Sequence, residues 1–201
     1  MIAAIIPAAG RSQRMGEPKA LLPYRGATFL ETILQACRAL GLNRRIVVLG
    51  RDKDQIARAM DLSGETVLLN PDPASGPLRS VQLAIRQILD HPVEAALVWH
   101  VDRPHVGIAT AQAMIDRFRE GGAAIVVPAY SGKRGHPVLF ARAVFEELLT
   151  TPASHGARRV VRADPGRVAT APVNDRAVCE DIDTPEDYAT LLRQVDPRPT
   201  E

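Results

Sequence analysis

The sequence has few of the features that mark disulfide-rich proteins, zinc knuckles or membrane proteins. Its 201 residues include two cysteines, Cys37 and Cys179, and neither belongs to a C-x-x-C pair. A disulfide scaffold, a zinc knuckle and a thiol redox motif are therefore unsupported. No apolar run approaches the roughly 20 residues that a membrane-spanning helix needs, so we expect no membrane partner.

Neither sign of charge dominates the sequence. Lys and Arg number 25, Asp and Glu number 23, and the formal net charge is +2. A nucleic acid is therefore not an expected partner for the surface as a whole. The first nine residues lack a basic leader and read as the start of a strand, so we expect no signal peptide and a cytoplasmic location.

The chain opens with a buried strand and a basic loop. Residues 2–6 are apolar and lead into Pro7-Ala8-Ala9-Gly10, which is typical of a parallel strand ending in a tight loop. Two glycines, Gly10 and Gly16, can adopt positive φ and let backbone N–H groups surround an anion. The pattern predicts a triphosphate-binding loop, although a solvated basic loop would have the same composition. Its cations are Arg11, Arg14 and Lys19.

This loop is neither of the two standard nucleotide loops. A Walker loop has four residues between its glycines and a lysine directly after the second one. Here five residues separate Gly10 from Gly16, and Lys19 comes three positions later. The G-x-G-x-x-G dinucleotide pattern is missing as well.

Apolar periodicity and turn residues predict alternating strands and helices. Thr28 and Glu31 have the spacing of a capping box, and Pro77 suits a first helical turn. The alternation favours an α/β fold with a mostly parallel, doubly wound sheet. The expected strands are 2–6, 45–50, 65–69, 94–101, 123–128 and 168–171, and the expected helices are 28–40, 52–60, 77–89, 107–120, 142–149, 155–162 and 184–194.

The remaining segments complete this prediction. Residues 130–137 have the glycine spacing of a hairpin or flap, from which the chain returns through 138–140. We expect one domain over residues 1–195. The tail 196–201 contains two prolines and is expected to be disordered.

Two acidic segments are candidates for a metal site. Asp102 follows the predicted strand 94–101, at the sheet edge where α/β proteins bind ligands, although a helix cap or loop carboxylate would also fit. In the second segment, Thr184-Pro185 predicts a helix start, which accounts for the acids after it. It does not account for Asp181 and Asp183, which flank Ile182 on the same side of an extended segment. One or both could complete a cation site with Asp102.

Three further residues stand near Asp102 in the sequence. Trp99, the single tryptophan, is expected in the core. His100 would share a strand face with Asp102. A zinc site with His100 and His105 is not favoured, because no second pair of ligands accompanies them.

The basic loop resembles a known signature. Residues 8–19 read A-A-G-R-S-x-R-M-G-x-x-K and precede Leu21-Leu22-Pro23. This resembles the loop of the nucleotidyltransferases with the GT-A-like fold, in particular the molybdenum cofactor nucleotidyltransferases. The resemblance implies a single-domain, Rossmann-like, three-layer α/β/α sandwich. It also implies nucleotide contacts from Ala8, Ala9, Gly10, Arg11, Ser12, Arg14, Met15, Gly16 and Lys19.

Later segments resemble the same family. Asn70-Pro71 and residues 76–80 are similar to its base and ribose segment, which implies nucleotide contacts from Asn70, Gly76 and Ser80. Asp102-Arg103-Pro104 is similar to its Asp-x-Pro metal motif, and residues 181–187 to its closing motif, which implies Mg²⁺ bound by Asp102 and Asp183. The acceptor-side segment implies Arg134, Gly135 and His136 as acceptor contacts; His136 could equally be structural.

The implied reaction transfers a nucleotidyl group from CTP or GTP to a molybdopterin-type phosphate monoester and releases pyrophosphate. Such a transfer depends on positioning and on offsetting negative charge, so no nucleophilic side chain is needed. The expected catalytic residues are Arg14, Lys19 and Asp102, with Mg²⁺ as cofactor. A molybdoenzyme would be a further partner.

Some residues leave the finer assignment open. The family's usual Asp-Gln-Pro is Asp102-Arg103-Pro104 here, which adds a cation beside the expected metal site. Residues 76–78 resemble the guanylyl-transferring branch and residues 134–137 the cytidylyl-transferring branch, and cytosine is favoured. Ser80-Val81 resembles the cytidylyltransferases of isoprenoid synthesis. Transfer to an isoprenoid or sugar phosphate, and a non-catalytic carrier that delivers cofactor to a molybdoenzyme, are the alternatives.

Overall fold

The computed structural model describes residues 1–10, 12 and 14–195. The expected nucleotide contact of Arg11 and the expected disorder of the tail 196–201 lie outside the described residues. Among the described residues, no helix combines the length and apolar character that crossing a membrane requires.

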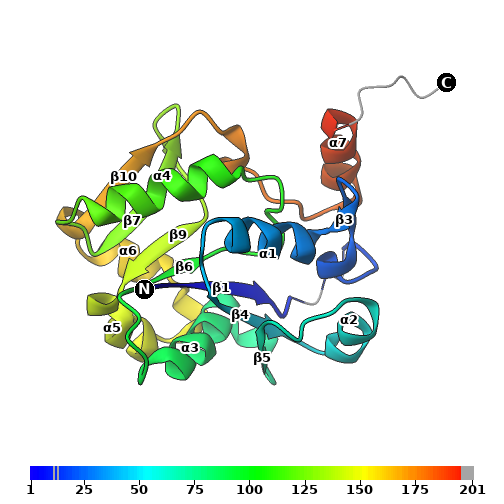
Figure 1. Ribbon diagram of the computed structural model, residues 1–201, viewed down its shortest axis with the longest axis horizontal. Helices are drawn as coiled ribbons and strands as arrows, with labels where there is room; N and C mark the ends of the chain where they lie inside the picture. The colour runs from blue at the N-terminus through cyan, green and yellow to red at the C-terminus, as the bar shows by residue number, and fades with distance from the viewer. Residues whose placement is uncertain (11, 13, 196–201) are drawn as a thin grey trace.

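The centre of the molecule is a mixed, mostly parallel sheet, as predicted (Figure 1). Its path runs β10-β7-β9-β6-β1-β4-β5, and β8 pairs with β7. Only β9 and β8 run antiparallel to their neighbours. The strands are β1 (Ile2–Ala8), β4 (Arg44–Leu49), β5 (Thr66–Leu69), β6 (Ala95–Val98), β7 (Ile125–Tyr130), β8 (Lys133–Arg134), β9 (Val138–Ala141) and β10 (Val168–Pro172).

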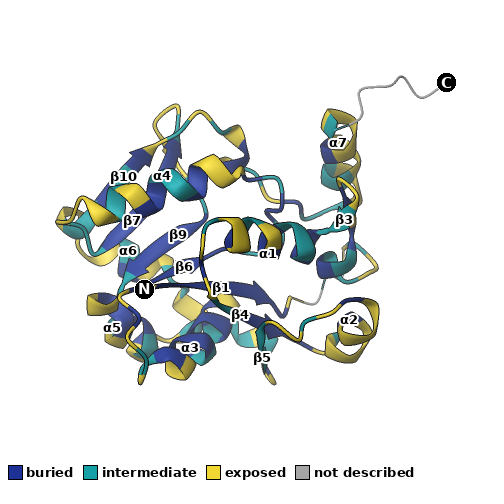
Figure 2. Ribbon diagram, viewed as in Figure 1, coloured by how far each residue is buried: buried dark blue, intermediate teal, exposed yellow. Residues whose placement is uncertain are grey.

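Helices pack on both faces of this sheet. Successive residues of β1 alternate between two core clusters: Ala4 and Ile6 join the first, and Ala3 and Ile5 the second. The first cluster contains side chains from α1 (Phe29–Ala39), α2 (Lys53–Ala59), α4 (Ile108–Arg119) and α7 (Pro185–Val195). The second contains side chains from α3 (Pro77–Ile88), α5 (Phe145–Thr150) and α6 (Arg158–Ala163). The layers are therefore α/β/α, with the sheet buried and the outer helix faces exposed (Figure 2).

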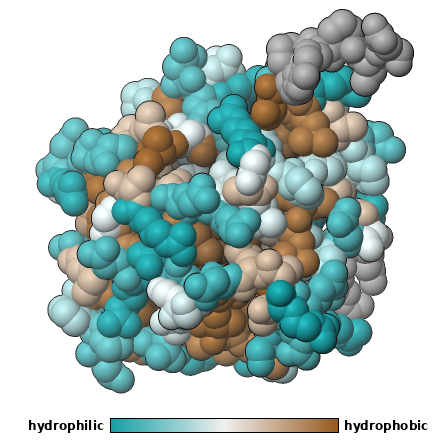
Figure 3. All heavy atoms as spheres, turned by 45° about the vertical axis from the view of Figure 1, so that its right-hand side comes forward, coloured by the Kyte–Doolittle hydropathy of each residue, from teal (hydrophilic) through white to brown (hydrophobic). Residues whose placement is uncertain are grey.

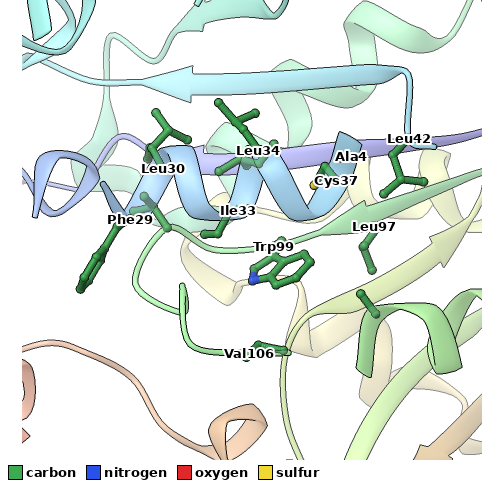
Figure 4. Close-up of a cluster of buried hydrophobic side chains, with 14 of the residues drawn as sticks. Ala4, Phe29, Leu30, Ile33, Leu34, Cys37, Leu42, Leu97, Trp99 and Val106 are labelled. Carbon is green, nitrogen blue, oxygen red and sulfur yellow. The ribbon is translucent and has the colours of Figure 1, made fainter. Parts of the chain in front are cut away.

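Helix α1 begins at the predicted capping box. The Thr28 hydroxyl accepts from the Glu31 backbone N–H at 3.2 Å, and the Glu31 carboxylate accepts from the Thr28 N–H at 2.7 Å. These bonds satisfy two amides that a helix start leaves free. The apolar face of α1 packs on the sheet near Trp99, which is fully buried as predicted (Figure 4).

The boundaries differ from the predictions at a few points. The strand expected over 94–101 ends at Val98, because the chain turns where Arg103 N–H donates to the His100 carbonyl at 3.2 Å. The helix expected over 142–149 is a 3₁₀ turn, Arg142–Val144, followed by α5. A small hairpin of β2 (Pro23–Tyr24) and β3 (Ala27–Thr28) was not expected, because its strands are too short to show alternation.

The expected hairpin over 130–137 is formed by β7 and β8. Its two turn residues, Ser131 and Gly132, have φ values of 47° and 79°, as a type I′ turn requires. Beyond it, Gly135 packs directly on the Val178 backbone, where a Cβ atom would overlap the carbonyl oxygen. This contact fixes the hairpin against the segment that leads to α7.

Gly135→Ala is expected to destabilise the protein, because the added methyl group must displace the Val178 backbone. We expect urea denaturation to show a loss of about 1–3 kcal/mol in the free energy of unfolding. Gly64→Ala is the matched control, since its added methyl group would lie 3.9 Å from the Arg45 side chain. Equal effects of the two substitutions would contradict the close approach at Gly135.

Candidate active site

A cavity of about 530 Å³ lies at the carboxyl ends of β1 and β6. In Figure 1 the arrow of β1 points toward this edge, between α2 and α7. With this side turned forward, hydrophilic and apolar side chains are interleaved on the surface (Figure 3). The predicted site residues that line the cavity are Ala8, Ala9, Gly10, Ser12, Arg14, Lys19, Asn70, Gly76, Ser80, Asp102 and Asp183.

The basic loop is shaped by Ser12. Its carbonyl accepts from the N–H groups of Met15 at 2.9 Å and Gly16 at 3.1 Å, and its hydroxyl accepts from the Lys19 N–H at 3.1 Å. Gly16 has a φ of 76°, a conformation that favours glycine. Met15 and Gly16, expected to contact nucleotide, are not among the residues that line the cavity. Met15 instead packs against the first core cluster.

Two of the three expected cations and the two expected metal ligands form one cluster. The Lys19 Nζ lies 2.5 Å from Asp183 Oδ1 and 3.8 Å from Asp102 Oδ2. The Arg14 guanidinium lies 2.8 Å from Asp183 Oδ2. The hydrogen bond from Lys19, together with the charges of Lys19 and Arg14, lowers the pKa of Asp183. Lys19 therefore stands between carboxylates from two segments that are remote in sequence.

Backbone contacts bring these acidic segments together. The Ile182 N–H donates to the Asp102 carbonyl at 3.1 Å, which joins the residues before α7 to the turn after β6. Asp183 lines the cavity, whereas Asp181 forms an ion pair with Arg103. Of the two aspartates expected to complete the cation site, Asp183 is therefore the one whose residue lines the cavity.

The cluster fits a divalent cation. Asp102 Oδ1 is buried and lacks a hydrogen-bond partner among the described residues. Such an oxygen is a natural cation ligand. The described residues contain no group of three or more His, Cys, Asp or Glu side chains that could hold a metal alone. An ion on Asp102 and Asp183 would therefore complete its coordination with phosphate and water oxygens, as Mg²⁺ commonly does.

The opposite wall comes from the turn after β5 and the start of α3. Asn70 and Ser80 are buried, and the Asn70 side-chain amide donates to the Ser80 hydroxyl at 3.0 Å. The Asn70 Oδ1 accepts from the Asp72 N–H at 3.0 Å. These bonds hold the segment in place, and Gly76 precedes α3 with a φ of 108°.

The expected acceptor residues do not line this cavity. Arg134 is exposed on β8, and Gly135 packs on Val178. The His136 ring lies 5.2 Å from the His100 ring, and its Nδ1 is buried without a hydrogen-bond partner among the described residues. Burial, with smaller effects of His100 and Arg103, lowers the pKa of His136 to about 3. Burial therefore disfavours the positively charged form of the His136 ring.

His100 is a cavity residue that the sequence-based site did not include. It lines the cavity together with Asp102, and its ring lies edge-on to the ring of His136. The sequence did contain a signal for His100. One residue separates it from Asp102, and this spacing predicted that both side chains lie on the same face of the strand. Asp52 and Val101 also line the cavity without having been expected there.

Comparison with known proteins identifies the family. Residues 4–169 match the family model of the MobA-like NTP transferase domain. The chain belongs to the MobA-like NTP transferase family. This places the cation–carboxylate cavity in a nucleotidyltransferase of α/β/α architecture.

Two curated relatives of this MobA-like chain align over nearly its whole length. It is 31% identical over 191 residues to the molybdenum cofactor cytidylyltransferase of Escherichia coli, covering 92% of this chain and 93% of that protein. It is 30% identical over 200 residues to the nicotine blue oxidoreductase of Paenarthrobacter nicotinovorans, covering 95% and 96%. These two relatives are named for different reactions.

A solved structure shows the same fold. Rv0371c of Mycobacterium tuberculosis superposes with a TM-score of 0.85 at 32% identity, covering 96% of this chain and 98% of that one. The structure of the same protein in complex with manganese superposes with a TM-score of 0.81 at 33% identity, again covering 96% of this chain and 98% of that one.

Asp183→Asn is expected to strengthen nucleotide binding in the absence of metal, because Asp183 competes with a triphosphate for Arg14 and Lys19. We expect a roughly two- to five-fold lower dissociation constant for CTP in EDTA, measured by calorimetry. Glu180→Gln removes the same charge three residues away and should change binding less. Weaker binding to Asp183→Asn, or an equal gain for Glu180→Gln, would contradict the competition.

Proposed function

We propose that this chain transfers a nucleoside monophosphate, with CTP favoured over GTP as donor, to a phosphorylated small molecule of the molybdopterin type. The observation that carries the proposal is the cavity in which Arg14 and Lys19 face Asp102 and Asp183. Cations and carboxylates that lie in contact in one cavity suit a triphosphate with its metal ion.

The cations and the carboxylates of the cavity would have separate roles. Arg14 and Lys19 would bind the triphosphate and offset the negative charge that passes to the departing pyrophosphate. Asp102 and Asp183 would hold Mg²⁺ or Mn²⁺, which supplies charge neutralisation at the phosphates when bound. The acceptor phosphate already carries nucleophilic oxygens, so the chain needs only to orient it toward the donor.

The preference for cytosine rests on similarity. The molybdenum cofactor cytidylyltransferase of Escherichia coli is similar to this chain over 92% of the chain's length. The Asn70–Ser80 pair and Gly76 form the wall where a base or ribose would lie. They favour neither base by themselves.

Reduction of a small molecule is a second candidate. The observation that favours it is the 30% identity to nicotine blue oxidoreductase over 200 residues. A nucleotidyltransferase needs a nucleoside triphosphate, whereas an oxidoreductase needs a redox co-substrate, for which NADH and NADPH are suitable probes. Binding of CTP and of NADH or NADPH, compared by thermal shift with and without Mg²⁺, therefore separates them.

We expect pyrophosphate release when the protein is mixed with CTP, Mg²⁺ and a molybdopterin acceptor. Asp102→Asn should reduce the rate by about 100-fold or more, because the metal loses a ligand at the reacting phosphates. Asp116→Asn, an exposed carboxylate on α4, is the matched control and should retain the wild-type rate.

Normal turnover by Asp102→Asn would contradict the metal assignment. Tight CTP binding without pyrophosphate release from any phosphorylated acceptor, molybdopterin, isoprenoid or sugar phosphate, would contradict the transferase and favour a carrier that serves a molybdoenzyme.

A further inference from the structure

Arg103 is a buried charged residue directly behind the cavity. It is 7% exposed and is the only charged residue in the buried class among the described residues. It does not line the cavity, although Asp102 beside it does. The sequence suggested an additional cation at the metal site. The structure instead directs the guanidinium toward Asp181, so its charge is matched by a partner.

The Arg103 side chain and backbone join several segments. One guanidinium nitrogen donates to the Val178 carbonyl at 2.8 Å, and the other pairs with the Asp181 carboxylate. The Val178 carbonyl also accepts from the His136 N–H at 2.9 Å. The Arg103 carbonyl in turn accepts from the buried indole N–H of Trp99 at 3.0 Å. The turn after β6, the segment after β8 and the segment before α7 are thus joined through Arg103 and the Val178 carbonyl.

The contacts of Arg103 influence the position of Asp183. Asp181 is held by Arg103, the next N–H in the chain binds the Asp102 carbonyl, and Asp183 follows on the cavity wall. The Arg103 side chain is 9% exposed and the Asp181 side chain 51%, so loss of this carboxylate would leave the buried guanidinium without its charged partner. Planar, two-point binding by arginine also fixes direction, which a lysine at this position would not.

We propose that Arg103 is a positioning residue for the metal site, acting through Asp181 and Val178 to set the place of Asp183 relative to Asp102. The proposal rests on the proposed function, since it requires that Asp102 and Asp183 bind the ion. Arg103 itself touches neither metal nor nucleotide. Its substitution should therefore change metal affinity more than it changes metal-free nucleotide affinity.

The test compares two arginines of the full chain whose side chains have little exposed area and form ion pairs. Arg103→Gln removes the ion pair behind the cavity. Arg45→Gln removes a similar one: the Arg45 side chain is 12% exposed, pairs with Glu65 at 2.6 Å and donates to the Leu42 carbonyl at 2.9 Å. Arg45 lies near the start of β4, at the opposite end of the strand from the cavity. Both substitutions should lower the melting temperature.

Of these two arginine variants, only Arg103→Gln should weaken Mn²⁺ binding. With CTP present, we expect its Mn²⁺ dissociation constant, measured by electron paramagnetic resonance, to rise about 10-fold or more, as for other residues that orient metal ligands. Arg45→Gln should stay within about two-fold of wild type. CTP affinity in EDTA should change little in either variant.

The outcomes separate the two proposals. If wild type shows no Mn²⁺ binding with CTP, the proposed function fails and this inference fails with it. If wild type binds Mn²⁺ and both arginine variants bind it equally well, Arg103 is structural only and the inference alone is overturned.

Asp181→Asn provides a second measurement that stands if Arg103→Gln does not fold. It keeps the Arg103 bond to Val178 and should weaken Mn²⁺ binding in the same direction as Arg103→Gln, by a smaller factor. Wild-type Mn²⁺ affinity in Asp181→Asn would overturn the role of the pair. If Asp181→Asn lost Mn²⁺ affinity while Arg103→Gln kept the wild-type Mn²⁺ affinity, Asp181 would itself be a metal ligand. That result would also overturn the positioning role of Arg103.

Discussion

The site depends on one ammonium group held between two carboxylates. The Lys19 side chain is 12% exposed, and its Nζ contacts Asp183 and Asp102 together. Charges this poorly solvated are costly unless they are matched, so the loop after β1 and the acidic segments must lie together. The same matching makes the cluster responsive to ligands. Under the proposed function, a triphosphate would give Lys19 and Arg14 new partners, and a divalent ion would bind the carboxylates of Asp102 and Asp183.

Much of the fold supports this small cluster. The carboxyl ends of β1 and β6, adjacent and parallel, bring the basic loop and Asp102 to one edge of the sheet. Trp99, buried under α1, holds the turn after β6 through its indole N–H. Arg103 links that turn to the segment before α7, from which Asp183 reaches Lys19. A stable core thus holds together charged groups that water would otherwise hydrate separately.

The sequence was most informative where local rules decide the structure. The capping box of α1, the first-turn proline of α3 and the buried opening strand were all predicted correctly, because short-range bonds and apolar periodicity determine them. The antiparallel insertion of β9 between β6 and β7 depends on long-range pairing and carries no local signal. The different partners of Asp181 and Asp183 arise likewise from tertiary contacts, as does the packing of Gly135 on Val178.

A crystal structure with a non-hydrolysable CTP analogue and Mn²⁺, with anomalous diffraction to locate the metal, tests the account most directly. We expect the manganese signal between Asp102 and Asp183, and the triphosphate on Arg14 and Lys19, with the Lys19–Asp183 contact replaced. Manganese bound away from these two carboxylates, or a nucleotide outside the loop with Lys19 still on Asp183, would contradict the account.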